Sequence, residues 1–188
     1  MPFLVFRPGL LDSPPANPVE CSTNGRNCTI VNSYGAFSDR STCIASMKAY
    51  LTTEKDLLDA VAQGTQAKQK MRVVIQFSHS MKKLACTDGY DGRLISTEFL
   101  NRTLSVDVEA MTITVQSGVS LRQLIEDAAI FGLALMAPHW WGLTVGGMMS
   151  TGSHCSTWHS DRSAFHDYIT EMRMITPAAP HLEPSQRG

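Results

Sequence analysis

Three short stretches of the sequence carry the residues best suited to chemistry. The first, Phe77-Ser78-His79-Ser80, contains an imidazole, a group that is unprotonated and nucleophilic near neutral pH because histidine titrates at about 6.5. The other two, Gln116 to Ser120 and Thr144 to His154, consist largely of small residues. Small residues let the backbone approach a ligand closely and present its N–H groups to a phosphate. Residues of these types permit contact with a phosphate and nucleophilic chemistry, but by themselves they establish neither.

Each stretch also has a purely structural interpretation. His79 could form ordinary hydrogen bonds within a loop, and Ser117-Gly118 could be only a turn between a strand and a helix. The small residues between Thr144 and Gly152 could pack one helix against its neighbours. Composition alone leaves both interpretations open.

Two helices are expected to help position these stretches. Thr53 is a suitable N-cap, and Glu54 and Asp56 complement the dipole in the first turn that follows it. Ser120 is a second N-cap, and Gly132 suits the C-terminal stop of the helix that Ser120 begins. The expected apolar faces comprise Leu57, Leu58, Val61 and Ala62 in the first helix, and Leu121, Leu124, Ile125 and Ala128 in the second.

Strands are expected beside all three stretches. The apolar run 71–76 ends directly before Phe77, and residues 111–115 alternate apolar and polar side chains before the turn at Ser117. Further strands are expected at 93–96 and 168–175. Strands alternating with helices favour an α+β or α/β domain, and we assign the chain to the α+β class.

The domain limits follow from composition. Residues 1–20 are rich in proline and are expected to form a tail, residues 21–177 the folded domain, and residues 178–188 a divergent, disordered tail. The segment 21–40 is rich in Asn, Ser, Thr and Gly, so we expect it to be a loop.

Net charge excludes some partners. The chain has 16 basic and 17 acidic residues, a formal net charge of -1, and no basic stripe that would attract a nucleic acid. No apolar run approaches the roughly 18 residues of a membrane-spanning helix. We therefore expect neither nucleic-acid binding nor membrane insertion.

The cysteines favour an oxidising compartment. Cys21, Cys28, Cys43 and Cys86 lie in the first half of the chain, and a Cys21–Cys28 bridge would close the first loop. The alternative is that they are free buried thiols. Two sequons, which begin at Asn27 and Asn101, agree with passage through the secretory pathway. The expected location is the secretory pathway or the extracellular space, with membrane association left open, and the native N-terminus is expected upstream of Met1.

The order of these motifs resembles a known family. The stretches at 77–80, 115–121 and 144–154 look like the FAD-binding domain of the vanillyl-alcohol oxidase family, the PCMH-type flavoproteins. Within this family the chain is most similar to plant L-gulonolactone oxidases. Four segments carry this similarity: Ser78-His79-Ser80, Cys86-Thr87-Asp88-Gly89, Leu94-Ile95-Ser96-Thr97, and Trp140-Trp141-Gly142-Leu143-Thr144-Val145-Gly146-Gly147.

The resemblance implies a fold and a cofactor. FAD would lie between two small α/β subdomains, the second of which we expect to be incomplete, and a C-terminal cap domain that covers the flavin has no counterpart in this sequence. His79 would carry the covalent bond to FAD. The other implied cofactor contacts are Phe77, Ser78, Ser80, Ser117, Gly118, Val145, Gly146, Gly147, Thr151, Gly152, Ser153 and His154. No catalytic residue can be assigned without the cap domain.

The implied activity is FAD-dependent oxidation of a sugar lactone of the L-gulonolactone type. Oxygen would be the acceptor, and the products would be an ascorbate-type lactone and hydrogen peroxide. Related lactones, such as arabinonolactone, stay open as substrates. The alternative is a non-catalytic fragment that only binds flavin, and we expect the 188-residue chain by itself to be inactive. A cysteine-stabilised interaction domain is a third candidate.

Other reactive side chains have simpler explanations. The spacing of the histidines and of Cys155 matches no recognised metal-ligand pattern, so we expect no metal site. Trp140 and Trp141 could form a platform on which a sugar stacks, but packing in the core is the favoured interpretation.

Overall fold

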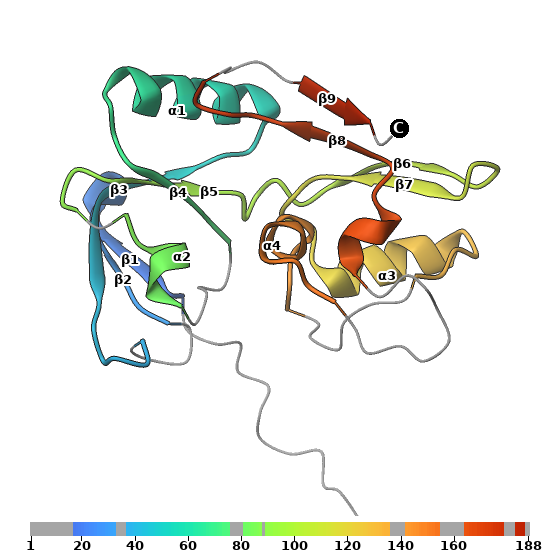
Figure 1. Cartoon of the computed structure of the whole chain (residues 1–188), viewed down its shortest axis with the longest axis horizontal. Coiled ribbons are helices and arrows are strands. Elements are labelled where there is room, and N and C mark those ends of the chain that lie inside the picture. Colours follow the sequence, from blue (N-terminus) through green and yellow to red (C-terminus); the bar gives the residue numbers. More distant parts are fainter. Residues whose placement is uncertain are drawn as a thin grey trace, which may run out of the picture.

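The computed structural model describes residues 17–32, 37–75, 81–87, 89–135, 142–154, 164–178 and 183–186. They form two lobes side by side (Figure 1). The first lobe, residues 19–96, contains β1 Val19–Ser22, η1 Thr23–Gly25, β2 Arg26–Ile30, β3 Cys43–Tyr50, α1 Glu54–Gln66, β4 Met71–Val74, α2 Lys82–Ala85 and β5 Arg93–Ser96. The second lobe, residues 103–168, contains β6 Thr103–Asp107, β7 Thr112–Val115, α3 Leu121–Ile130, α4 Val145–Thr151 and η2 Phe165–Tyr168.

The first lobe is built on a mixed sheet of five strands in the order β1-β2-β3-β5-β4. β1, β2 and β3 pair antiparallel, whereas β5 lies parallel between β3 and β4. β4 is therefore an edge strand. Its carboxyl end leads into the histidine stretch at 77–80, which lies outside the described residues.

Helices cover both faces of this sheet (Figure 1). On one face α1 packs over a core that includes Leu51, Val61, Ile95 and Leu100. On the other face α2 contributes Ala85 to a second core, which consists of Val19, Cys28, Ile30, Phe37, Cys43, Ala45, Val74, Ala85, Cys86 and Leu94. Leu94 of β5 belongs to the core on one face and the next residue, Ile95, to the core on the other, because successive side chains of a strand point to opposite faces.

Two disulfides stabilise the first lobe. Cys21 bonds to Cys28 and so joins β1 to β2, the pairing that the sequence offered as one possibility. Cys43, at the start of β3, bonds to Cys86 directly after α2, and their Cα atoms lie 5.9 Å apart. Four of the five cysteines are therefore oxidised.

The second lobe packs two helices beside a hairpin. β6 and β7 pair antiparallel, and α3 and α4 share a core that contains Val119, Leu121, Leu124, Met148 and Phe165. The chain then returns to the first lobe through β8 Glu171–Met174, which pairs antiparallel with β9 Glu183–Gln186. Both guanidinium NH groups of Arg173 contact the Glu54 carboxylate of α1, at 3.2 and 3.3 Å.

Most predicted elements are confirmed. α1 begins after Thr53, whose side chain accepts a hydrogen bond from the N–H of Asp56, and Ser120 caps α3 in the same way. Gly132 has a φ of 73° after α3, a left-handed conformation that glycine adopts without strain. The mixed α+β class is confirmed as well. The buried face of α1 is slightly different from the prediction, since Ala60 and Gly64 are buried and Ala62 is exposed.

Two predictions about loops are wrong. The segment expected to be a loop at 21–40 contains the second half of β1 and all of β2, because buried Cys28 and Ile30 alternate with exposed neighbours although the composition is polar. Residues 183–186, expected to be disordered, form β9. They pair with β8, whose edge offers free N–H and C=O groups.

The remaining differences concern strands. β3 and β6 were not predicted, and the last expected strand is shorter, because 165–168 form the 3₁₀ helix η2. Among the described residues, no helix combines the length and the apolar character needed to cross a bilayer.

Candidate functional site

Segments that are far apart in the sequence meet at the start of α4. The main-chain N–H of Gly146 donates to the carbonyl oxygen of Ser117 at 2.8 Å, which joins α4 to the turn after β7. The Cδ1 atom of Ile75 lies 3.5 Å from the position that a Cβ on Gly147 would occupy. Ile75 is the last described residue before the histidine stretch. Two of the three stretches singled out in the sequence therefore meet at the junction between the lobes, together with the strand end that precedes the third.

The first N–H groups of α4 are already used inside the protein. Val145 donates to the carbonyl of Val119 at 2.9 Å, Gly146 donates to Ser117 as above, and Gly147 donates to the Thr144 hydroxyl at 3.2 Å. These three N–H groups therefore already have acceptors within the protein and are not free for a phosphate.

Gly118 and Gly146 allow protein segments to pack closely. A Cβ on Gly118 would lie 2.0 Å from the carbonyl oxygen of Thr97, and a Cβ on Gly146 would lie 3.1 Å from the Cβ of Ser117. At these two positions the structural interpretation of the small residues explains the glycine. Ser117 therefore packs against α4 and Gly118 packs against the segment after β5, so both residues hold these segments together.

Gly147 also packs against protein. A Cβ there would lie 3.2 Å from the Thr144 hydroxyl oxygen and 3.5 Å from the Cδ1 atom of Ile75, distances close to the one found at Gly146. Because both neighbours are side-chain atoms, these contacts join α4 to the end of β4 without the severe overlap with backbone that a Cβ would meet at Gly118.

The end of α4 presents polar groups to solvent. Gly152 has a φ of 63° and no atom within 4 Å of its Cβ position, so the chain turns in open space there. The hydroxyls of Thr151 and Ser153 lie 3.2 Å apart, and Thr151, Gly152 and His154 are exposed. His154 also forms an isolated β-bridge with Ala164. These predicted contact residues lie at the surface, where a cofactor can reach them.

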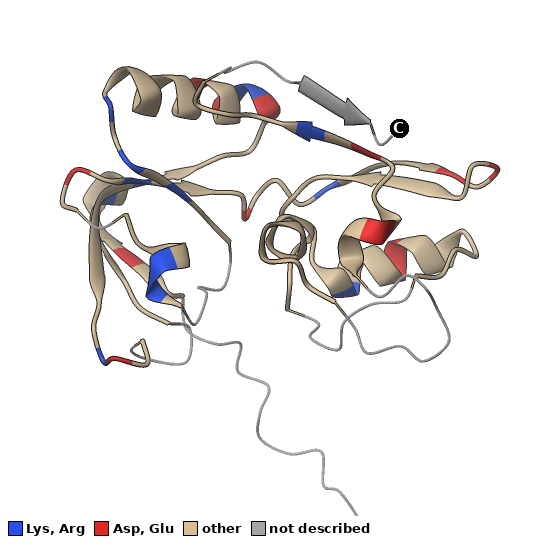
Figure 2. Ribbon diagram, in the orientation of Figure 1, with Lys and Arg blue, Asp and Glu red and all other residues tan. Residues whose placement is uncertain are grey.

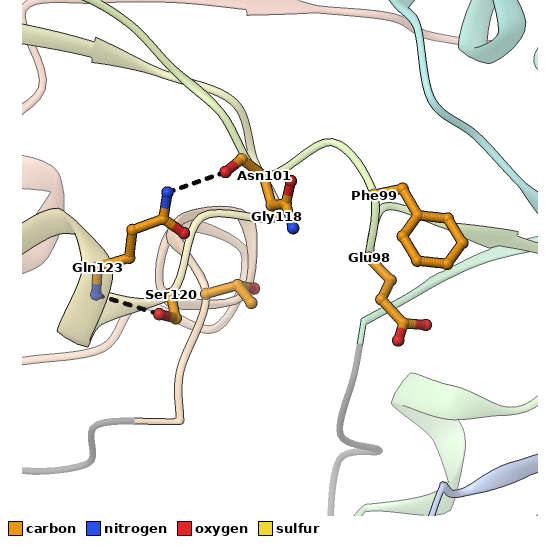
Figure 3. A pocket seen from close by; sticks show the side chains of 7 residues that line it. Glu98, Phe99, Asn101, Gly118, Ser120 and Gln123 are labelled. Carbon is orange, nitrogen blue, oxygen red and sulfur yellow. Dashed lines mark hydrogen bonds between the residues drawn. The ribbon is translucent and has the colours of Figure 1, made fainter.

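A pocket of about 200 Å³ opens beside this junction, between the segment that joins the lobes and the start of α3. Figure 3 shows Glu98 and Phe99 on one side and Asn101, Gly118, Ser120 and Gln123 on the other. The Gln123 side chain donates to the carbonyl of Asn101 at 3.0 Å, and the Gln123 N–H donates to the Ser120 hydroxyl at 3.2 Å. Of these residues, the sequence singled out only Gly118 and Ser120, the first as a cofactor contact and the second as a helix cap.

A buried cation lies behind this pocket. Lys48 of β3 is 3% exposed, and its Nζ lies 4.0 Å from a Glu98 carboxylate oxygen and 4.5 Å from the centre of the Tyr50 ring. The Tyr50 ring in turn lies 5.7 Å from the ring of Phe99. Elsewhere acidic and basic residues are interspersed over both lobes (Figure 2). No sequence pattern marked Lys48 or Glu98, because they lie far apart in the chain.

Several predicted residues lie outside the described residues. They include the histidine stretch, namely Phe77, Ser78, His79 and Ser80, and the two tryptophans. Their predicted roles stay predictions. Within the described ranges, no three His, Cys, Asp or Glu side chains are placed to hold a metal ion.

FAD fits two features of this arrangement. The contact between Gly147 and Ile75 brings the start of α4 against the strand end that leads to the histidine stretch. The end of α4 adds exposed hydroxyls and an imidazole, which can form hydrogen bonds with a flavin or a ribityl chain. The donor set therefore suits a large polar cofactor held between two lobes.

Comparisons of the whole chain agree with this geometry. L-gulonolactone oxidase 2 of Arabidopsis thaliana is 56% identical over 170 residues, which are 90% of this chain and 29% of that protein. L-gulonolactone oxidase 5 of the same plant is also 56% identical, over 171 residues. The L-gulonolactone oxidase of Mus musculus is 33% identical over 113 residues, 60% of this chain and 25% of that protein. The chain thus spans less than a third of the length of these relatives.

Solved structures share the fold at low sequence identity. A crystallised alkyldihydroxyacetonephosphate synthase superposes with a TM-score of 0.66 at 15% identity, over 85% of this chain and 31% of that one. A variant of Phl p 4, a glucose dehydrogenase, superposes with a TM-score of 0.65 over 87% of this chain and 30% of that one. The model of the FAD binding domain matches residues 45–182, so the chain belongs to the FAD binding domain family.

Proposed function

We propose that this chain supplies the flavin-binding part of an oxidase that acts on a sugar lactone of the L-gulonolactone type. Bound FAD would take a hydride from a carbinol carbon and deliver two electrons to oxygen, which gives an ascorbate-type lactone and hydrogen peroxide. The two plant relatives, whose matches each cover 90% of this chain, are named for this activity. The structural support is the meeting of Ile75, Ser117 and Gly147 at one junction.

Within this proposal, residues of the chain hold and orient the cofactor. The start of α4 at Gly147 would border part of FAD between the lobes, and Thr151, Ser153 and His154 would offer hydrogen bonds along its edge. Gly118 and Gly146 let the supporting segments pack closely behind. Together these contacts keep the reactive face of the flavin in one orientation, which is the protein's main contribution in a flavoenzyme.

The most specific part of the proposal is that an imidazole nitrogen of His79 forms a covalent bond to the 8α-methyl carbon of the flavin. The new C–N bond would replace a C–H bond of the flavin and the N–H bond of His79; the two electrons and two protons released would end on oxygen as hydrogen peroxide. Ile75 supports this role, because it places the strand end four residues before His79 beside Gly147. A neutral imidazole is the form that can attack.

Acid precipitation tests the tether. The full chain, expressed with sufficient riboflavin and precipitated in acid, is expected to give a yellow pellet and an adduct of FAD mass on the peptide that contains His79. His79→Ala is expected to release all of its flavin into the supernatant, whereas His166→Ala, on η2, serves as the matched control and keeps the adduct. A yellow supernatant from the parent protein would refute the tether.

A second candidate function is flavin binding without turnover. The chain corresponds to 29% of each of these plant relatives, which favours the view that turnover requires further parts of such a protein. Peroxide release with L-gulonolactone, measured on the 188-residue chain loaded with FAD, separates the two. Turnover supports the oxidase in this chain itself, and flavin retention without peroxide supports the second candidate.

We also propose the secretory pathway or the extracellular space as its location. The two disulfides support this, because disulfides persist in oxidising compartments. Alkylation of free thiols in freshly extracted protein, followed by peptide mass spectrometry, is the test. Unmodified Cys43 and Cys86 are expected, and labelling of both would argue for a reducing compartment.

A further inference from the structure

The two sequons of the chain lie in different surroundings. The first begins at Asn27, directly after the turn η1, inside the ring that the Cys21–Cys28 disulfide closes. The second begins at Asn101, in the segment between β5 and β6 that joins the lobes. Both asparagines are exposed. A glycan is bulky and needs free space around its asparagine, so the surroundings decide which of the two positions can carry one in the folded protein.

The ring around the first sequon is held on one side and open on the other. A Cβ on Gly25 would lie 2.8 Å from the carbonyl oxygen of Lys48, so the turn packs closely on β3 there. Asn24, Arg26 and Asn27 are exposed. Asn27 has a φ of 49°, in the left-handed region that asparagine adopts more readily than most other residues. This turn is therefore a fixed surface feature, as a glycan acceptor in a secreted protein is expected to be.

The first sequon is also distant from the candidate functional site. The sheet order places β3 and β5 between β2, which carries Asn27, and β4, whose end leads to the junction at Ile75. Three strand spacings amount to about 14 Å. A glycan on Asn27 therefore leaves the junction between the lobes free.

The second sequon lies at that junction. Asn101 lines the pocket of about 200 Å³ beside Gly118 (Figure 3), and its carbonyl accepts a hydrogen bond from the Gln123 side chain at 3.0 Å. The hydroxyl of Thr103, the third residue of this sequon, donates to the Asp127 carboxylate of α3. A branched glycan on Asn101 would have to leave through the place where the two lobes meet. The geometry therefore disfavours a glycan at Asn101.

We propose that Asn27 carries an N-linked glycan and that Asn101 does not. The donor is an oligosaccharide linked through pyrophosphate to a lipid, the form in which the endoplasmic reticulum supplies such glycans. The side-chain nitrogen of Asn27 forms a bond to C1 of the first sugar and loses one proton, and the lipid pyrophosphate leaves with the electron pair of the broken C–O bond. No oxidation or reduction takes place. The inference rests on the proposed passage through the secretory pathway and does not depend on which lactone is oxidised.

Electrophoretic mobility before and after treatment with a peptide N-glycosidase tests the position. The full chain is secreted from insect cells behind an added signal peptide. Asn27→Gln and Thr29→Ala are each expected to run like the enzymatically deglycosylated parent. Thr29→Ser is expected to restore the glycan, because serine also completes a sequon.

Two control variants keep the glycan if the inference holds. Asn24→Gln changes an exposed asparagine of the same turn that belongs to no sequon, and Asn101→Gln removes the second sequon. Both are expected to run like the untreated parent. Loss of the glycan in Asn101→Gln, or its retention in Asn27→Gln, overturns the inference.

Peptide mass spectrometry of the protein from its native tissue separates this inference from the proposed location. Enzymatic deglycosylation in water enriched in heavy oxygen converts a glycosylated asparagine into a labelled aspartate, which is expected at position 27 and not at 101. An unlabelled position 27 in a protein whose two disulfides are formed overturns the inference while the location stands. An unlabelled position 27 together with free thiols at Cys43 and Cys86 makes both fail.

Discussion

A Cβ atom on Gly118 would lie 2.0 Å from the carbonyl oxygen of Thr97 and 2.7 Å from that of Leu100. The N–H of Gly118 also donates to the Leu100 carbonyl at 2.8 Å. The turn that begins the helical part of the second lobe is therefore packed directly on the segment that leaves β5. This contact fixes where α3 and α4 start relative to the sheet, and so where the junction at Gly147 lies.

Gly118→Ala should destabilise the fold, because backbone atoms on both sides leave no room for a methyl group. We expect a loss of about 1–3 kcal/mol in the free energy of unfolding, measured by urea denaturation. Gly147→Ala is the control, since its Cβ would lie 3.2 Å or more from its neighbours, and we expect a change of at most about 1 kcal/mol. Similar losses in the two variants would show that packing at Gly118 is not special.

The two disulfides should contribute unequally. The Cys43–Cys86 bridge closes a sequence separation of 43 residues and the Cys21–Cys28 bridge one of 7, so the first restricts the unfolded chain more. Loop entropy predicts losses of about 4 kcal/mol for the Cys43→Ala, Cys86→Ala double variant and about 2 kcal/mol for Cys21→Ala, Cys28→Ala. Guanidinium denaturation under non-reducing conditions measures both. An equal or reversed order would contradict the entropic explanation.

The N-cap of α1 should make stability depend on acid pH. Hydrogen bonds from Thr53 and then from Thr52 lower the pKa of Asp56 below its usual range. A lowered pKa in the folded state stabilises the fold above the unfolded pKa, and that contribution is lost as the pH falls through the folded pKa. The parent protein should therefore lose unfolding free energy below about pH 4.

Asp56→Asn isolates this contribution. The variant should be less stable at neutral pH, and its unfolding free energy should fall less steeply below about pH 4. Urea titrations at several pH values provide the comparison, with exposed Glu109→Gln as the control. A slope in Asp56→Asn as steep as that of the parent would assign the acid sensitivity to other carboxylates.

Arg93 should hold α1 on the sheet. Its guanidinium donates to the carbonyl of Ala60 at 3.2 Å and to the side-chain oxygens of Gln63 and Gln69 at 3.3 and 3.0 Å, and the residue is only 8% exposed. Arg93→Met should cost about 1.5–3 kcal/mol, because a buried carbonyl loses a charged donor. Gln69→Met removes one acceptor only and should cost less in thermal or chemical unfolding. Equal losses of stability in the two variants would show that the hydrogen bond from Arg93 to the Ala60 carbonyl contributes little.

Much of the local structure could be predicted from the sequence. The caps at Thr53 and Ser120 and the stop at Gly132 depend on residues within one turn of the helix end, so their positions follow from local rules. β2 could not be predicted in this way. Its buried Cys28 and Ile30 are interrupted by polar residues, and only pairing with β1 and β3 selects the extended form.

The candidate site shows the same division. The three stretches around His79, Ser117 and Gly147 were visible as runs of small and reactive residues, and their order alone indicated the family. By contrast, Lys48 and Glu98 belong to no motif, because they are separated by fifty positions and meet only when β3 and the segment after β5 lie side by side. Residues that act through such contacts require the folded chain.

The sequence by itself determined the cofactor family and the limits of most helices, because both depend on short patterns of neighbouring residues. Only the tertiary structure decided which glycines pack against protein, as Gly118 does, and which lie in open space, as Gly152 does. It also decided that the first donors of α4 are already used and that a carboxylate faces the pocket. Those properties depend on atoms brought together from distant positions, and no local pattern encodes their distances.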